Sequence, residues 1–397
     1  MPPPPGSSPP KKRGLEAVAR ALFAPLLLGQ APGWKVVSWD AEQGLAITLQ
    51  RGDRASGAIL VELEDRNDGR DCFARTARFN VCARRLFDAN TPITVEERAF
   101  LDRFVQVVRA AEGRLPLAPP TPAPTGPERT VIREILVERA LIPEGAGSYY
   151  FNPYAGCMIG CPFCYVAERA DLSRRLEGLP SAAWGRWLDV KVNAAEVMRR
   201  EVETLPPGLV RMSPILTDPY QPVEKRYRIT RQCLEVLLGA GFTPVILTRA
   251  ARVTDDLDLL ARFPRAAVGF SIPTDDDAVR RAFEPGADPV EARFEALAAC
   301  HAAGLYTFGV IQPMLPMNAV RLVEKMAPLV RAVRIDRMHF VEKSEPIYRA
   351  AAADYALGDE FFAATERTLT EGFTARGVAI DRHDNLEVLL GALMRRP

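Results

Sequence analysis

Three of the seven cysteines lie in one short segment, residues 157–164, which reads CMIGCPFC. Cys157, Cys161 and Cys164 therefore have the spacing CxxxCxxC. Glycines at 156 and 160 let the backbone turn sharply enough for the three thiolates to converge. Thiolates are the soft ligands that bind zinc or iron–sulfur clusters. The segment predicts a metal centre in a reducing compartment.

The number of cysteines in this segment indicates which kind of metal centre to expect. A structural zinc ion takes four protein ligands, usually from two paired motifs, and the sequence contains no second CxxC, CxxH or HxxxH. Three protein ligands fit better with an iron–sulfur cluster that has one open iron. A structural zinc and unmetallated core thiols are the alternatives.

The elements that must position this segment show an alternation of short apolar runs and helical periods. Such alternation predicts an α/β fold in which helices cover a parallel sheet, as a full or partial barrel. The predicted strands span 209–212, 245–247, 267–272, 307–311 and 333–338, and the predicted helices span 230–238, 255–262, 289–303 and 319–330.

The composition along the chain predicts five segments. They are a disordered tail (1–13), an α+β accessory domain (14–113), a proline-rich linker (114–127), the barrel (128–345) and a C-terminal helical extension (346–397) with one strand near 378–380.

The accessory domain is expected to contain a helix ending near Gln30, three strands and a closing helix. Apolar alternation places strands at 44–49, 58–63 and 73–83, and Thr94 with Glu97 forms a capping signature for the helix to Glu112. We expect this domain to bind substrate or a carrier. The alternative is that it only covers the open side of the barrel.

The overall composition excludes several protein classes. The 397 residues are 48% hydrophobic, which is enough to form a folded core. The 51 Lys+Arg against 50 Asp+Glu give a net charge of +1, so no overall positive electrostatic field attracts nucleic acid or anionic membranes. The sequence contains no apolar run long enough to span a membrane. We therefore expect a cytoplasmic protein with no membrane partner.

The cysteine motif, with the aromatic Phe163 just before Cys164, resembles that of the radical S-adenosylmethionine (SAM) enzymes. This resemblance implies a [4Fe-4S] cluster held by Cys157, Cys161 and Cys164, whose open iron chelates SAM. It also implies an electron donor such as flavodoxin or ferredoxin. Reduction would then cleave SAM to methionine and a 5'-deoxyadenosyl radical that abstracts hydrogen from a substrate.

Further segments resemble the subfamily that contains spore photoproduct lyase. These segments are 152–154, 190–193, 217–224, 270–274 and 283–287. The resemblance implies a partial (β/α)6 TIM-like barrel, in agreement with the strand–helix alternation.

The same resemblance implies a set of residues around SAM. Ser271 would contact SAM, and Arg249, next to Thr248, stands where the subfamily usually has a lysine near the SAM carboxylate. Asp218 and Glu224 would reach the ribose or the SAM amine; turn-forming and helix-capping roles are the alternative. The aromatic residues Phe163, Tyr165 and Tyr220 would line the site; for Tyr165 and Tyr220, a packing role is the alternative.

The reaction itself is less well defined by the sequence. Spore photoproduct lyase donates hydrogen from a cysteine downstream of its cluster, and the stretch 192–227 contains none here. We therefore favour a peptide or small-metabolite substrate over DNA photoproduct repair. A non-catalytic redox sensor that binds nucleic acid is the other alternative, although only the arginine-rich segment 75–85 offers a basic strand. We interpret the remaining cysteines as core or strand residues, and the sequence identifies no catalytic residue.

Overall fold

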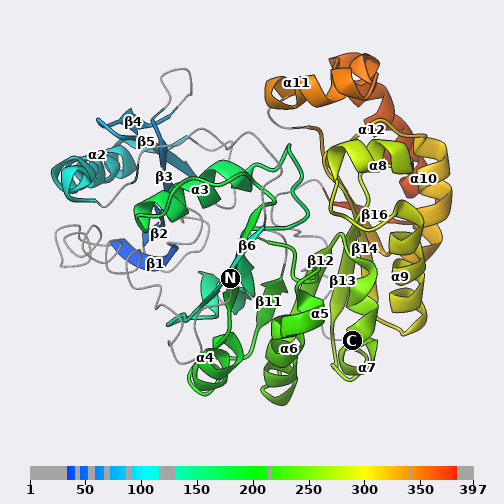
Figure 1. Cartoon of the computed structure of the whole chain (residues 1–397), viewed down its shortest axis with the longest axis horizontal. Helices are drawn as coiled ribbons and strands as arrows, with labels where there is room; N and C mark the ends of the chain where they lie inside the picture. Colours follow the sequence, from blue (N-terminus) through cyan, green and yellow to red (C-terminus); the bar gives the residue numbers. More distant parts are fainter. Residues whose placement is uncertain are drawn as a thin grey trace.

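The computed structural model describes residues 34–40, 45–51, 59–66, 72–85, 92–115, 118, 130–145, 147–212, 217–338 and 341–381 (Figure 1). The predicted tail, the helix ending near Gln30, most of the proline-rich linker and the last sixteen positions, 382–397, lie outside the described residues.

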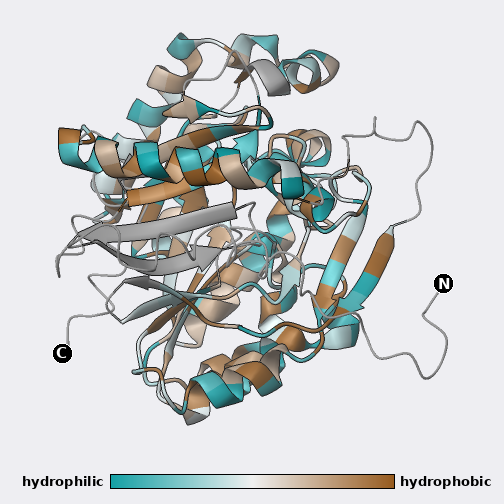
Figure 2. Cartoon of the chain, turned by 90° about the vertical axis from the view of Figure 1, so that its left-hand side faces the viewer, coloured by the Kyte–Doolittle hydropathy of each residue, from teal (hydrophilic) through white to brown (hydrophobic). Residues whose placement is uncertain are grey.

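The N-terminal unit is a five-stranded antiparallel sheet with one helix on it. Its strands lie in the order β1-β2-β3-β5-β4. The elements are β1 (Trp34–Asp40), β2 (Leu45–Arg51), β3 (Ile59–Asp65), β4 (Ala74–Arg75), β5 (Phe79–Arg85) and the helix α2 (Val95–Ala111). The predicted capping box is confirmed, because Thr94 N–H donates to Glu97 Oε2 at 2.7 Å and Glu97 N–H to Thr94 Oγ1 at 3.3 Å. Polar and apolar residues alternate along the helices on this side of the molecule (Figure 2).

The strand predicted at 73–83 is instead a hairpin of β4 and β5. The turn is fixed by Glu112, whose carboxylate accepts the N–H groups of Ala77 at 3.2 Å and Arg78 at 3.1 Å. The residue that stabilises this turn therefore comes from the far end of α2.

The main sheet has eight strands in the order β16-β15-β14-β13-β12-β11-β8-β7. All neighbours pair in parallel except β7 with β8. Its strands are β7 (Ile142–Gly145), β8 (Ser148–Tyr150), β11 (Leu209–Met212), β12 (Thr243–Thr248), β13 (Ala267–Ser271), β14 (Tyr306–Ile311), β15 (Ala332–Ile335) and β16 (Ala379–Asp381). This confirms an α/β fold with a mainly parallel sheet.

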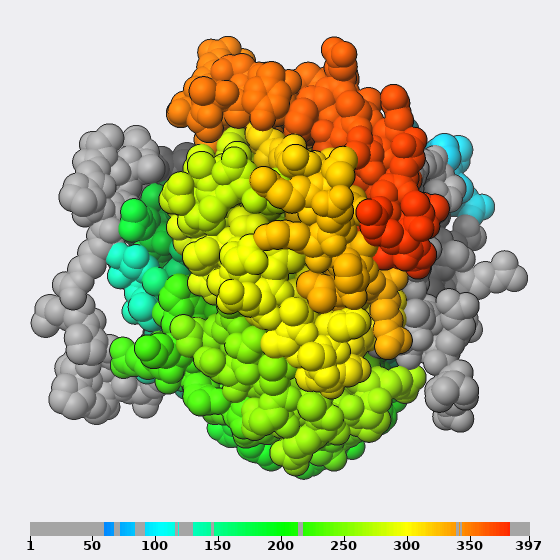
Figure 3. Space-filling view, turned by 90° about the vertical axis from the view of Figure 1, so that its right-hand side faces the viewer, coloured from blue at the N-terminus to red at the C-terminus, as the bar shows by residue number. Residues whose placement is uncertain are grey.

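Helices follow the strands as predicted. They are α6 (Ile229–Gly239), α7 (Leu257–Leu260), α9 (Val290–Ala302), α10 (Ala319–Met326) and α12 (Asp359–Thr374). The helix predicted at 255–262 is shorter, because its first part is a 3-10 turn (Ala251–Asp256). Figure 3 shows that the later segments of the chain, coloured yellow to red, cover much of one face of the molecule.

Several elements near the cysteines are not visible in the periodicity of the sequence. A second sheet orders its strands as β6-β10-β9. These strands and the neighbouring helices are β6 (Val131–Ile135), β9 (Tyr154–Ala155), β10 (Trp187–Lys191), α3 (Val166–Leu176), α4 (Ala194–Glu201), α5 (Glu224–Tyr227) and α8 (Asp277–Phe283).

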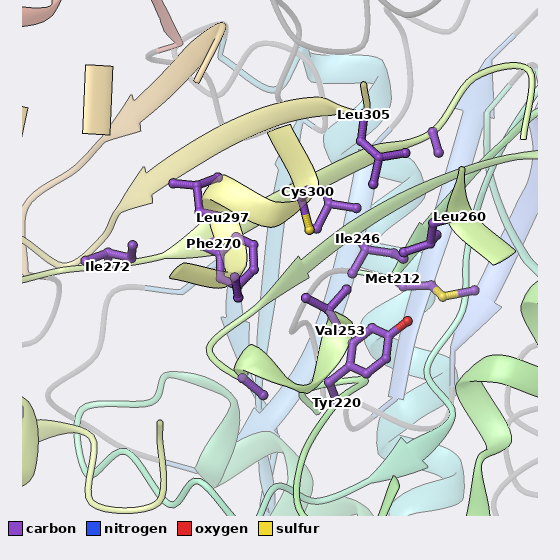
Figure 4. Packing of buried hydrophobic residues seen from close by; sticks show 14 of the residues in the cluster. Met212, Tyr220, Ile246, Val253, Leu260, Phe270, Ile272, Leu297, Cys300 and Leu305 are labelled. Carbon is purple, nitrogen blue, oxygen red and sulfur yellow. The ribbon is translucent and has the colours of Figure 1, made fainter. Parts of the chain in front are cut away.

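The core lies between the main sheet and its helices. Cys233 and Cys300 are fully buried in it, which confirms their interpretation as core residues. Figure 4 shows Cys300 packed among apolar side chains that include Phe270 and Leu297.

The N-terminal unit shares its core with a helix of the following domain. Leu172 and Leu176 of α3 belong to the same apolar cluster as β3, β5 and α2. Arg169 of α3 pairs with Glu62 of β3 at 2.7 Å, and Arg175 pairs with Asp65. Figure 1 shows α3 beside β3. The N-terminal sheet is thus docked directly on α3.

The C-terminal segment also joins the main body. β16 adds to the main sheet parallel to β15, at the position where the sequence predicts a strand. The predicted border between residues 345 and 346 falls inside α11 (Val341–Ala350). None of the helices in the described part of the chain is both long and apolar enough to cross a membrane.

Candidate functional site

The three motif cysteines lie in the loop between β9 and α3. Cys157 and Cys161 are buried and Cys164 is half-buried; the structure records no disulfide for them or for the other described cysteines. Burial raises the pKa of the Cys157 thiol to about 12, and it also raises the pKa values of Cys161 and Cys164. These thiols therefore stay protonated unless a bound metal stabilises the thiolates.

One side of the cysteine loop is held by the segment that follows β11. Thr217 Oγ1 donates to the Gly156 carbonyl at 2.6 Å, and Gln221 Oε1 accepts the Met158 N–H at 2.8 Å. Gln221 Nε2 also donates to Thr217 Oγ1. These two residues lie in a segment that carries the subfamily resemblance, but sequence reasoning assigned no role to either. The only signal in the sequence for such a role is that Thr217 and Gln221 are polar residues four positions apart.

The other side of the loop is held by the turn after α8. Gly286 N–H donates to the Ile159 carbonyl at 3.0 Å. A Cβ on Gly286 would lie 2.6 Å from the Met158 carbonyl oxygen, so only glycine allows this approach. Ala287 packs against Cys157 and Cys161.

Asp218 and Thr248 are bonded to each other. Asp218 is buried, and its Oδ1 accepts Thr248 Oγ1–H at 2.6 Å and the Tyr220 N–H at 2.9 Å. Its Oδ2 accepts the Arg249 N–H at 2.7 Å. Burial raises the pKa of Asp218, and these three donors oppose the rise. Asp218 is thus fully engaged in joining the segment after β11 to the end of β12, as in the turn-forming alternative.

Arg249 lies at the end of β12 beside the cysteines. Its Nε donates to Glu284 Oε1 at 2.6 Å. Its guanidinium opposes the burial-driven rise in the pKa of Cys161 and of Cys164. The structure therefore brings Arg249 into the electrostatic neighbourhood of two motif cysteines.

Ser271, the last residue of β13, has a buried side-chain hydroxyl. The residue is 1% exposed, and its hydroxyl has no hydrogen-bond partner among the described residues. A buried hydroxyl without a partner is costly, and this hydroxyl is available for a hydrogen bond to a group outside the described residues. This feature fits the predicted contact between Ser271 and SAM.

Glu224 is placed in a helix-capping position. Tyr154 donates its hydroxyl to Glu224 Oε2, and Glu224 Oε1 accepts the Arg231 N–H at 3.3 Å near the start of α6. Burial raises the pKa of Glu224 to about 7. These contacts fit the capping alternative.

The two aromatic candidates have different surroundings. Phe163 is half-buried and packs against the cluster formed by Cys157, Cys161, Ile159 and Ala287. Tyr165 is 49% exposed, and the Arg169 guanidinium lies 5.8 Å from its ring centroid. Phe163 is therefore part of the cysteine environment, and Tyr165 lies at the surface beside α3.

The arrangement can be compared with known types of metal site. Across the described residues, no three His, Cys, Asp or Glu side chains are arranged to hold a metal ion. The cysteine prediction concerns a cluster, in which each thiolate binds a different iron atom. The donor set of three thiols in one loop, enclosed on two sides, fits such a cluster.

Comparison with known proteins identifies the domain. Residues 151–324 match the family model described as the Radical SAM superfamily. The resemblance of the cysteine motif is thereby confirmed for this part of the chain, which is a radical SAM domain. The domain implies an iron–sulfur cluster and SAM as its cofactors.

Among curated proteins, the chain is similar to the uncharacterized protein ORF301 of Acidianus two-tailed virus, with 32% identity over 45% of this chain and 60% of the relative. It is also similar to the uncharacterized protein MJ0683 of Methanocaldococcus jannaschii, with 27% identity over 42% of this chain and 61% of the relative. The chain thus spans less than two thirds of the length of either relative. Among solved structures, a spore photoproduct lyase variant aligns with a TM-score of 0.44 and 15% identity, over 62% of this chain and 81% of that chain.

Proposed function

We propose that the protein binds a [4Fe-4S] cluster at Cys157, Cys161 and Cys164 and uses it for radical chemistry with SAM. The observation that carries this proposal is the enclosed loop with three thiols inside a radical SAM domain. When bound, the reduced cluster supplies the electron that splits SAM into methionine and a 5'-deoxyadenosyl radical, which takes a hydrogen atom from the substrate.

The role proposed for the chain's own residues is to fix the loop and exclude water from it. Thr217 and Gln221 hold the loop backbone on one side, and Gly286 holds it on the other. Burial of Cys157 and Cys161 keeps solvent away from their sulfur atoms. Such enclosure protects an iron–sulfur centre from solvent and strengthens its electrostatic interactions with nearby charges.

The SAM side of the site is proposed to involve Ser271 and Arg249. The Ser271 hydroxyl supports this assignment because it is buried without a protein partner in the described part of the chain. The Nε of Arg249 is already used by Glu284, so a SAM carboxylate would meet the other end of the guanidinium. Asp218, Thr248 and Glu224 are proposed to shape the site instead of touching SAM.

The substrate is proposed to be a peptide or a small metabolite. DNA photoproduct repair stays the second choice because residues 192–227 contain no cysteine to return the hydrogen atom. A flavodoxin or ferredoxin is the proposed electron donor.

The N-terminal unit is proposed to support the cysteine loop, in addition to any binding of substrate. Its sheet shares an apolar core with Leu172 and Leu176, on the helix that begins just after Cys164. This contact favours the covering role over a freely tethered substrate module.

Anaerobic reconstitution with iron and sulfide tests the proposed function. We expect about four irons per chain, broad visible absorbance and release of 5'-deoxyadenosine from SAM when a reductant is present. Replacing any one motif cysteine, as in Cys161→Ala, should abolish cluster absorbance or SAM cleavage, whereas Cys72→Ala in the N-terminal unit should leave both intact. A reconstituted protein that makes no 5'-deoxyadenosine would indicate the redox-sensor alternative. Retention of both signals in a motif variant would contradict the ligand assignment.

A further inference from the structure

A buried network of three charged side chains joins the ends of β12 and β13. Glu284 is 0% exposed and accepts hydrogen bonds from Arg249 Nε at 2.6 Å and from Arg293 Nη2 at 2.9 Å. Arg293, also 0% exposed, donates from Nη1 to the Ser271 carbonyl at 2.8 Å. One carboxylate therefore holds two guanidinium groups.

The segment that carries Glu284 is itself fixed against the cysteine loop. Two residues further on, Gly286 N–H donates to the Ile159 carbonyl, and Ala287 packs against Cys157 and Cys161. The position of the Glu284 carboxylate relative to the loop is thus set by backbone contacts. Through Glu284, the Arg249 guanidinium acquires a fixed position relative to the same loop.

Of the two arginines, Arg249 depends more strongly on Glu284. Arg293 makes two further good hydrogen bonds, to the carbonyls of Ser271 at 2.8 Å and Asp288 at 2.9 Å. The other side-chain hydrogen bond of Arg249 is a long one, 3.4 Å to the Gln312 carbonyl, and its side chain is 14% exposed. If Glu284 lost its charge, Arg293 would keep its place and Arg249 would turn toward solvent.

We propose that Glu284 is a positioning residue that holds the Arg249 guanidinium beside the cysteine loop and thereby makes the cluster easier to reduce. The inference rests on the proposed function. Reduction adds a negative charge to the cluster, so a positive charge fixed nearby stabilises the reduced state and raises the reduction potential. The contacts of Gly286 and Ala287 with the loop keep the paired Glu284 and Arg249 close to the cysteines.

The sign of a potential shift distinguishes this role from a simple charge effect. If Glu284 acts only through its own negative charge, Glu284→Gln raises the reduction potential. If it acts by holding Arg249, the same substitution lowers the potential, because the positive charge leaves. Arg249→Gln lowers it in either case.

The experiment is a dye-mediated redox titration of the reconstituted full chain, followed by electron paramagnetic resonance. We expect Glu284→Gln and Arg249→Gln each to lower the ratio of reduced to oxidised cluster at a fixed potential about tenfold, which is ~59 mV for a one-electron couple. The double variant should shift no further than either single one, because both remove the same interaction. Glu291→Gln, which removes an exposed carboxylate paired with Lys325, is the control and should leave the potential unchanged.

A higher potential in Glu284→Gln, or additive shifts in the double variant, would overturn the proposal. If Glu284→Gln does not fold, Arg249→Lys decides: we expect it to keep most of the wild-type potential while Arg249→Gln does not, and equal potentials would overturn the proposal. Iron content and visible absorbance separate the two levels of inference. A wild-type chain without a cluster contradicts the proposed function, whereas an intact cluster with unshifted potentials contradicts only the role of Glu284.

Discussion

The side chain of Gln221 holds the backbone of Met158, because Gln221 Oε1 accepts the Met158 N–H at 2.8 Å. Met158 follows the first motif cysteine, so a residue from the segment after β11 fixes the loop between the first two thiols. Gln221 is fully buried, and its amide also donates to Thr217, which in turn donates to the Gly156 carbonyl. The loop is therefore shaped by a side-chain network as well as by its own glycines.

We predict that Gln221→Ala weakens cluster retention. The substitution leaves the half-buried Met158 N–H without its acceptor, and loss of such a bond costs up to roughly 1–3 kcal/mol. The rate of absorbance loss under a chelator should rise severalfold. The control is Gln232→Ala, which removes an exposed amide that donates to the Tyr227 carbonyl on another part of the surface. Equal rates in the two variants would show that the network does not hold the loop.

A close approach of two glycines gives a second prediction. A Cβ on Gly160 would lie 3.2 Å from the Cα of Gly185, and Gly160 has a φ of +65°. Gly160→Ala therefore adds a tight contact with the Gly185 backbone to left-handed strain. Gly178→Ala is a matched control, because Gly178 has a φ of +76° and no atom within 4 Å of its Cβ position.

The strain alone should cost roughly 1–2 kcal/mol in both variants. Urea unfolding of the metal-free protein should show the larger loss for Gly160→Ala, and reconstitution should give less cluster only in that variant. If both variants lose the same stability and keep the same iron content, the contact with Gly185 is unimportant.

A third prediction concerns the pH dependence of stability. Burial raises the pKa of Glu224 to about 7 from an ordinary value of 4.5. Between these values the folded protein keeps a proton that the unfolded chain releases, so this group progressively destabilises the fold as pH rises from about 4.5 to 7. The full effect is roughly 3 kcal/mol at most.

Glu224→Gln should therefore gain stability relative to wild type as the pH rises. Urea unfolding of the metal-free protein at pH 5 and pH 8 measures the difference, and Glu235→Gln, an exposed residue on α6, is the control. If the free energy of unfolding of Glu224→Gln instead falls relative to wild type between pH 5 and pH 8, the hydrogen bonds from Tyr154 and Arg231 keep Glu224 ionised.

Local sequence patterns predicted the features that depend on neighbouring residues, namely the cysteine motif and the strand–helix alternation. The spacing of Cys157, Cys161 and Cys164 predicted the radical SAM domain, and periodicity predicted most strands and helices from residue 209 onward, although not α5 or α8. Polarity at strand ends was less informative. Asp218 and Thr248 were predicted to lie near SAM, and the structure shows that they are bonded to each other. The sequence could not predict this bond, because it does not show which way a polar side chain at a strand end points.

Contacts between distant segments explain what the sequence could not predict. The turn between β4 and β5 contains no glycine or proline, and it is fixed by Glu112 at the end of α2. Likewise, the apolar residues Leu172 and Leu176 gave no indication that their partners lie in the N-terminal sheet. The role of Glu284 depends on two arginines from different elements.

The docking of the N-terminal sheet on α3 gives the last prediction. Arg169 Nη1 lies 2.7 Å from Glu62 Oε1, and Arg169 Nη2 lies 3.7 Å from Glu64 Oε1. Arg169→Glu places a third carboxylate against these two, and loss of such a largely buried pair costs roughly 3 kcal/mol. Because α3 begins just after Cys164, a loosened interface should disturb the cysteine loop.

We expect Arg169→Glu to increase amide hydrogen exchange over residues 157–176 of the metal-free protein and to reduce the iron bound after reconstitution. Adding Glu62→Arg restores an opposite-charge pair and should recover part of both losses. Arg200→Glu, which breaks an exposed pair with Glu196 on α4, is the control and should change neither. If Arg169→Glu leaves exchange and iron content unchanged, the N-terminal unit does not support the loop, and a separate substrate-binding role becomes the better explanation for it.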